Sequence, residues 1–169
     1  MKRLLILAAI AASSLTASAQ WTFQTTAADE LTGTKEDIVY TYTDSLTGNT
    51  FTYYASVPDQ YILHAEHSTF NYKVLRSQYG TFSGLEVTVG LYDASGTLST
   101  KFDMWLDVQA GEGTADYART RNAGKLLNPV GQAKKVKKIL NHLTTTDGYV
   151  RIVAPLYGGT TFNLTIPSK

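Results

Sequence analysis

Leu85–Leu106, LEVTVGLYDASGTLSTKFDMWL, is the stretch that decides the fold of this chain. Apolar and polar residues alternate on both sides of a turn, Asp93–Gly96. The apolar residues of the first arm are Leu85, Val87, Val89 and Leu91, and those of the second arm are Leu98, Phe102, Met104 and Leu106. Because a period of two around a glycine-containing turn is typical of paired strands, the stretch predicts an antiparallel β-hairpin.

The same alternation occurs on both sides of this hairpin, with Tyr, Thr, Val and Phe as the β-forming residues. The turn cluster Asp44–Asn49 predicts a hairpin upstream, and Leu156–Gly159 predicts another near the end of the chain. Gln109–Asn128 has no sustained period and is expected to be a long loop. We therefore expect a mainly β protein, either an antiparallel β-sandwich or a strongly curved sheet, of about nine strands with one amphipathic helix near the C-terminus.

That helix is expected at residues 133–143. At roughly 100° per residue, one arc of this segment is apolar and the opposite arc is polar. The apolar arc holds Val136, Ile139, Leu140 and Leu143, and the polar arc holds Lys134, Lys137, Lys138 and Asn141. Gly148 stands where the chain is expected to leave the helix for the next strand.

Residues 1–19 have the features of a secretory signal peptide. Lys2 and Arg3 precede the apolar run Leu4–Ala12, and Ala17–Ala19 matches the small-x-small site of signal peptidase. We expect cleavage after Ala19, a single β-rich domain at residues 20–169, and a periplasmic or extracellular location. The apolar run is far shorter than the about 20 residues that span a bilayer, and no later stretch is long and apolar enough to span one, so no transmembrane segment is expected in the mature protein.

The chain contains no cysteine. This excludes disulfides, thiol catalysis and cysteine-ligated zinc, and together with export it favours a bacterial envelope or secreted protein. Phosphate-binding glycine motifs and nucleophile elbows are also absent from the sequence, so no cofactor is expected. Nucleic acid is not an expected partner of a chain that is exported away from it.

Charge is distributed unevenly along the chain. Residues 20–117 carry 4 basic and 13 acidic residues, a balance of −9, whereas residues 118–169 carry 9 basic residues and one acid, a balance of +8. Such asymmetry is a recognised sign of an anionic partner. The alternative is that the two halves attract each other within one compact domain.

Two groups of residues are candidates for binding. Trp105 and Asp103 fall on the polar face of their predicted strand, where an aromatic ring among hydrogen-bonding groups is suited to sugars; the alternative is that Trp105 packs beneath the following loop or into a second core layer. The second group is basic and is suited to anionic lipid, lipopolysaccharide or polysaccharide; the alternative is a solvated helix face. Its members are Lys134, Lys137, Lys138, Arg119 and Arg121.

His64–His67 is the one place where two imidazoles and a carboxylate cluster in the sequence. On a strand, residues three apart point to opposite faces, and the zinc motif HExxH needs a spacing of four. We therefore assign no metal ligand and no catalytic residue. The sequence favours an exported non-catalytic binding module; the alternatives are a small secreted hydrolase of cell-wall or dietary polymer, and a subunit of an envelope assembly.

Overall fold

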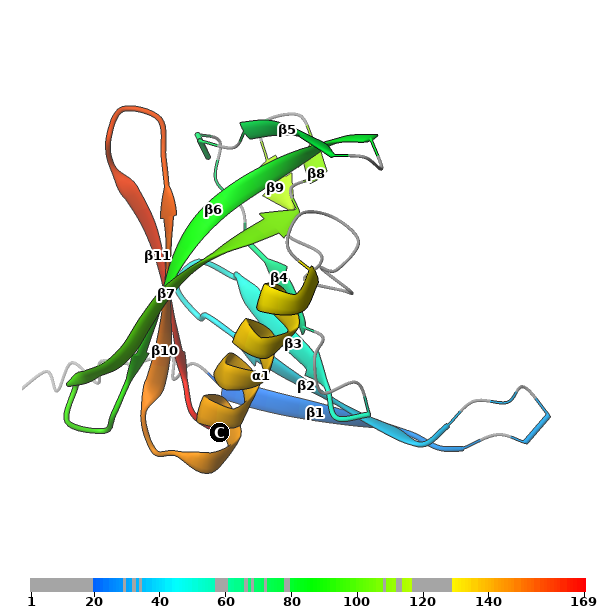
Figure 1. Cartoon of the computed structure of the whole chain (residues 1–169). Helices are drawn as coiled ribbons and strands as arrows, with labels where there is room; N and C mark the ends of the chain where they lie inside the picture. The colour runs from blue at the N-terminus through cyan, green and yellow to red at the C-terminus, as the bar shows by residue number, and fades with distance from the viewer. Residues whose placement is uncertain are drawn as a thin grey trace, which may run out of the picture.

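A computed structural model describes residues 20–28, 30, 31, 33, 35–56, 61–65, 67, 69–71, 73–77, 80–107, 109–111, 114–116 and 129–169 of the chain. The predicted signal peptide, together with Glu66, Arg119 and Arg121, lies outside the described residues. Within them the chain forms eleven strands and one α-helix (Figure 1). The fold is mainly β and antiparallel, with one helix near the C-terminus, as the sequence predicts.

The first sheet is an antiparallel meander of four strands in chain order. Its members are β1 (Gln20–Thr26), β2 (Asp37–Thr43), β3 (Thr50–Tyr54) and β4 (Tyr61–His64). The predicted turn joins β2 to β3: Asp44 accepts hydrogen bonds from the Leu46 amide and the Thr47 hydroxyl, and Gly48 has a φ of 73°. The hairpin of β1 and β2 projects from the rest of the molecule (Figure 1).

The second sheet has five strands. The central strand is β6 (Gly80–Tyr92), which pairs with β5 and β10 along one side and with β7 (Leu98–Asp107) along the other. Strand β11 pairs with β10. The other bounds are β5 (Lys73–Ser77), β10 (Tyr149–Pro155) and β11 (Thr161–Pro167). Leu85 lies opposite Leu106 and Val87 opposite Met104, which confirms the predicted central hairpin.

Two details of the sequence prediction are wrong. Part of the expected loop forms a small separate ladder, β8 (Gln109–Gly111) with β9 (Thr114–Asp116), which helps to bring the strand count to eleven rather than about nine. The helix α1 spans Pro129–Thr145 and is longer than the expected segment. Its first residue is a proline, which suits the first helical position because the amide hydrogen missing from proline has no partner there.

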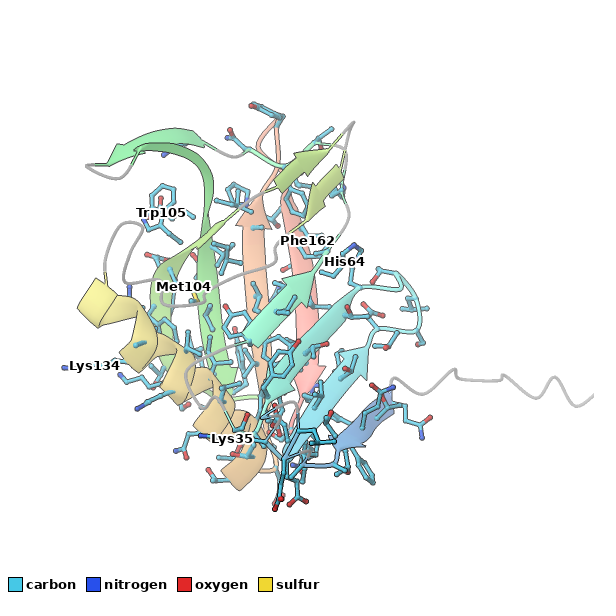
Figure 2. All side chains as sticks on the ribbon, turned by 90° about the vertical axis from the view of Figure 1, so that its right-hand side faces the viewer. Lys35, His64, Met104, Trp105, Lys134 and Phe162 are labelled. Atoms are coloured by element: carbon cyan, nitrogen blue, oxygen red, sulfur yellow. The ribbon has the colours of Figure 1, made fainter. Side chains whose placement is uncertain are left out.

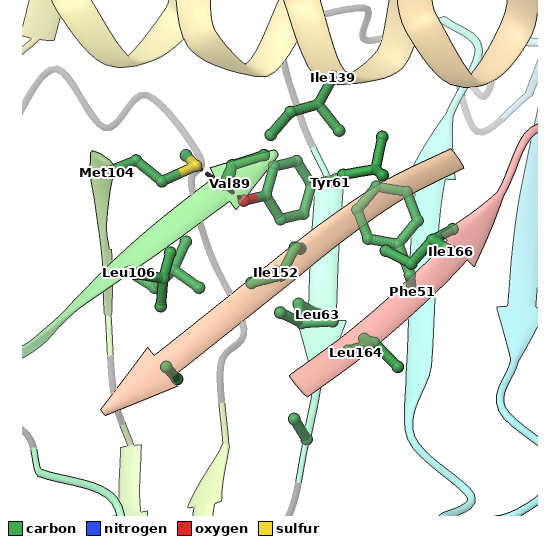
Figure 3. Packing of buried hydrophobic residues seen from close by; sticks show 14 of the residues in the cluster. Phe51, Tyr61, Leu63, Val89, Met104, Leu106, Ile139, Ile152, Leu164 and Ile166 are labelled. Atoms are coloured by element: carbon green, nitrogen blue, oxygen red, sulfur yellow. Dashed lines mark hydrogen bonds between the residues drawn. The ribbon is translucent and has the colours of Figure 1, made fainter. Parts of the chain in front are cut away.

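One hydrophobic core lies between the two larger sheets and α1 (Figure 3). Ile139 points from the helix toward Phe51 and Tyr61 of the first sheet and toward Val89 and Ile152 of the second (Figure 3). The predicted apolar arc of α1 is buried along its length. The helix therefore holds both sheets through the burial of apolar surface, at about 1.5–3 kcal/mol for each large apolar side chain.

The C-terminal segment is held against α1 and β1. The Trp21 indole donates to the Pro167 carbonyl at 2.9 Å, the Ser168 amide donates to Gly148 at 2.9 Å, and the Lys169 amide donates to Leu143 at 3.0 Å. The C-terminus lies beside the last turn of the helix (Figure 1). These bonds position the side chain of Lys169 next to the first sheet.

Candidate functional site

A pocket of about 580 Å³ lies between α1 and the first sheet. Its volume falls within the range of about 300–1,000 Å³ that is usual for small-molecule sites. The lining residues come from β2, from β3 and the residue that follows it, from α1 and from the C-terminus. They are Tyr40, Tyr53, Tyr54, Ala55, Lys137, Lys138, Leu140, Asn141, Thr144 and Lys169. We refer to this site as the Tyr–Lys pocket.

The sheet side of the Tyr–Lys pocket is aromatic. Tyr40 and Tyr53 lie directly opposite each other on β2 and β3, and their rings stack with centroids 5.0 Å apart and planes 19° apart. Strand period places Tyr42 and Phe51 on the same face, where both are buried in the core. Tyr53 is also buried in the core and Tyr40 is partly buried against it, so the pocket wall is the margin of the core face.

Lys169 contacts both tyrosines. Its ammonium nitrogen lies 3.3 Å from the centre of the Tyr40 ring and donates a hydrogen bond of 3.2 Å to the Tyr53 hydroxyl. Burial alone would lower the pKa of Lys169, but hydrogen bonding to the two tyrosines outweighs it and holds this pKa above its usual value. The pKa of Tyr53 is also raised, chiefly by burial, with Lys169 acting in the opposite direction. Lys169 is therefore held as a cation beside neutral rings.

The helix side of the Tyr–Lys pocket is polar. Lys137, Asn141 and Thr144 follow one another at spacings of four and three, so they form a row along one face of α1. Lys138 also lines the pocket, whereas Lys134 projects from the helix away from the sheets (Figure 2). Lys135 donates to the main-chain carbonyl of Asp103 at 2.6 Å and so ties the helix to β7.

Among the residues that the structure describes, the side chains lining the pocket include three lysines and no carboxylate. An anionic group on a ligand would meet the ammonium groups of these lysines, and an apolar part of the ligand would face the tyrosine side of the pocket. The arrangement is suited to a ligand that combines a negative charge with a planar or apolar surface.

The other predicted binding residues lie elsewhere. Trp105 and Asp103 occupy the outer face of β7, and Trp105 is half-buried with the Lys73 ammonium 5.9 Å from its ring centre. Asp103 accepts a hydrogen bond of 2.6 Å from the Thr88 hydroxyl and borders a second hollow of about 470 Å³ together with Lys73 and Glu86. The structure thus separates this pair from the lysines of the Tyr–Lys pocket.

His64 and His67 do not form part of either hollow. The His67 ring lies against the rings of Phe70 and Phe162, with centroids 5.6 Å and 6.4 Å away, and its Nδ1 is within 3.1 Å of the Thr69 hydroxyl. Among the described residues, no group of three or more His, Cys, Asp or Glu side chains is placed to hold a metal ion.

The described helix is also too short and too polar to cross a membrane.

Sequence reasoning found Lys137 and Lys138 but missed the aromatic half of the pocket. Tyr40 and Tyr53 were visible only as alternating strand residues, and Lys169 had no motif around it. The available signal was that tyrosine rather than an aliphatic residue continues the core face on two neighbouring strands. Comparison of the chain with protein-family models, curated proteins and solved structures finds no match.

Proposed function

We propose that this chain is an exported, non-catalytic binding module that takes up an anionic envelope component in the Tyr–Lys pocket. The component is an acidic saccharide, or the headgroup of lipopolysaccharide or of an anionic lipid. Export follows from the signal peptide predicted at residues 1–19, with cleavage after Ala19. The architecture we infer is a β-sandwich with α1 along one open side, which the core shared by both sheets supports.

The observation that carries the proposal is the combination of three lysines and stacked tyrosines in one concave site. Lysine side chains on a convex surface are commonly solvated and carry no such implication. Here Lys137 and Lys138 line a pocket whose opposite wall is already aligned by the Tyr40–Tyr53 stack and by Lys169. A preorganised site of this kind binds at a lower entropic cost than a mobile surface.

The test is retention of the purified protein on three anionic probes: lipopolysaccharide, phosphatidylglycerol vesicles and polygalacturonate. The double variant Lys137→Gln and Lys138→Gln should bind the preferred probe about tenfold more weakly, because loss of two partly exposed ion pairs amounts to about 1.4 kcal/mol. Binding of the parent should also weaken as salt is added. Any purification tag belongs at the N-terminal end, because Lys169 lines the pocket.

The control is Lys134→Gln, which removes one positive charge from the same helix outside the pocket. It should bind like the parent. Retention of the parent on none of the three probes, or equal loss in the control and the double variant, would refute the proposal.

A second candidate function is hydrolysis of an envelope or dietary polymer. Glu86 and Asp103 border the same outer hollow, and they are diagonal neighbours because Glu86 lies opposite Trp105 and Thr88 lies opposite Asp103. Diagonal neighbours have Cβ atoms about 7–8 Å apart or less, a spacing compatible with a pair of glycosidase carboxylates. The half-buried Trp105 beside them is suited to a sugar ring.

Release of dye from labelled peptidoglycan and from labelled polysaccharides tests the hydrolase. If it exists, Glu86→Gln and Asp103→Asn should each lower the rate by at least about a hundredfold. Glu30→Gln, a change at an exposed position of the β1–β2 hairpin, should leave it unchanged. A parent that releases no dye removes this candidate.

A further inference from the structure

Strand β1 is an edge of the first sheet. Among the described residues it pairs only with β2, in a register that runs without interruption from Gln20 opposite Thr43 to Thr26 opposite Asp37. Its sequence, QWTFQTT, contains no charged residue and no proline. The other side of the strand therefore presents main-chain amide and carbonyl groups along seven residues.

Edges of this kind are usually protected. Proteins blunt them with charged side chains, proline, bulges or very short strands, because an open edge is a template for another strand. The other edges of the two sheets carry such features: β4 has four residues, β5 carries Lys73 and Arg76, β7 carries Lys101 and Asp103, and β11 ends in Pro167. Of these edge strands, β1 alone is long, uncharged and free of proline.

The side chains of β1 are also uncovered. Six of its seven residues are exposed, and Phe23 retains 71 % of its surface. Phe23 lies on the same face as Trp21, which packs against the core. The Phe23 ring has one aromatic neighbour across the hairpin, Tyr40, at a centroid distance of 6.4 Å. An exposed phenylalanine beside an open strand edge is a surface suited to a partner strand that covers both.

We propose that β1 pairs antiparallel with β1 of a second copy of this chain, which joins two four-stranded sheets into one continuous sheet. A two-fold axis perpendicular to the sheet at Phe23, the centre of the seven-residue strand, places each residue opposite one of the same face: Phe23 meets its own counterpart, and Trp21 of each strand meets Thr25 of the other. Since the side chains of β1 carry no charge, this pairing brings no like-charged side chains together. The interface is independent of the ligand proposed for the Tyr–Lys pocket.

The first test is the mass of the exported protein in solution, measured by sedimentation equilibrium over a range of concentrations. The parent should be a dimer, and Phe23→Lys should be a monomer because two lysines would face each other across the axis. Leu46→Lys is the matched control: Leu46 is 92 % exposed in the β2–β3 turn, and its replacement should leave the dimer intact. A monomeric parent, or a dimer equally stable in both variants, would overturn the proposal.

The second test uses the absence of cysteine from the chain. Single cysteines introduced at Thr22, Phe23, Gln24 and Thr25 are oxidised in turn and the cross-linked fraction is measured. Directly opposite residues of antiparallel strands have Cα atoms about 4.5–5.5 Å apart, which suits a disulfide. One position, at the axis, should cross-link far more than its neighbours, whereas uniform or absent cross-linking would contradict the two-fold pairing even if Phe23→Lys fails to fold.

Discussion

The indole nitrogen of Trp21 donates a hydrogen bond of 2.9 Å to the carbonyl oxygen of Pro167, a residue 146 positions later in the chain. The Trp21 ring also lies 5.6 Å from the ring of Tyr42 and 5.9 Å from that of Tyr53. One side chain of β1 therefore connects the first strand, the aromatic face of the first sheet and the C-terminal segment. This connection holds Lys169 at the Tyr–Lys pocket.

Replacement of Trp21 by Phe should keep most of the ring contacts and lose the hydrogen bond to Pro167. The free energy of unfolding should fall by about 1–3 kcal/mol, from the lost bond and the smaller ring. Urea denaturation of the two proteins measures the difference. Trp105→Phe, on the outer face of β7, should leave the position of the C-terminal segment unchanged, so only Trp21→Phe should increase proteolytic trimming of Lys169.

Lys169→Met should lower the free energy of unfolding at neutral pH. In the variant, this free energy should also fall less steeply as the pH rises into the alkaline range. The pKa of Lys169 is raised in the folded protein, so its contribution is complete below the ordinary lysine pKa of 10.5 and disappears as pH rises through the folded value. The measurement is the unfolding free energy of parent and variant from neutral to alkaline pH. The difference between the two proteins should shrink as the pH rises; a constant difference would show that the ammonium charge contributes nothing.

Tyr61→Phe should reduce the alkaline sensitivity of the fold. Tyr61 is fully buried, which raises its pKa far above the ordinary value of 10.0. Between the ordinary pKa and the raised pKa, the unfolded chain loses the phenolic proton and the folded chain keeps it. The free energy of unfolding therefore falls by about 1.4 kcal/mol per pH unit for this group. The hydroxyl donates only a 3.4 Å bond to the Met104 sulfur, so its removal should cost little at neutral pH. Parallel pH curves for parent and variant would contradict the assignment.

Gly148→Ala should be severely destabilising, by more than about 3 kcal/mol, because a Cβ at this position would overlap the carbonyl oxygen of Tyr92. The backbone of Tyr92 is held in place by the sheet and by His142, whose Nε2 lies 2.9 Å from the same oxygen. Gly158→Ala is the comparison. Gly158 has a φ of 88° but open space around it, so its replacement by alanine should lower the free energy of unfolding by about 1 kcal/mol. Thermal melts of the two variants should differ clearly.

Local pattern predicted the parts of the fold in which neighbouring residues decide the outcome. The alternation in Leu85–Leu106 predicted the central hairpin, and the arc of Val136, Ile139 and Leu143 predicted the buried face of α1, because strand and helix periods are short-range properties. The ladder of β8 and β9 was missed. Its strands have three residues each, too few to establish a period.

The candidate site divides in the same way. Lys137 and Lys138 were predicted because they share a helix face, whereas Tyr40, Tyr53 and Lys169 come from segments whose proximity no local pattern encodes. Trp105 and Asp103 were correctly placed on the polar face of their strand, but nothing in the sequence said which side of the molecule that face would occupy.

The sequence by itself determined the β character of the chain, its main hairpin, the amphipathic helix and the concentration of positive charge in its last third. Only the tertiary structure decided which charges would meet which rings. The stack of Tyr40 on Tyr53 depends on the register of β2 with β3, and the approach of Lys169 depends on the hydrogen bond from Trp21 to Pro167. Contacts between residues so distant in the chain form only when the core packs, because packing and not local preference sets their distance.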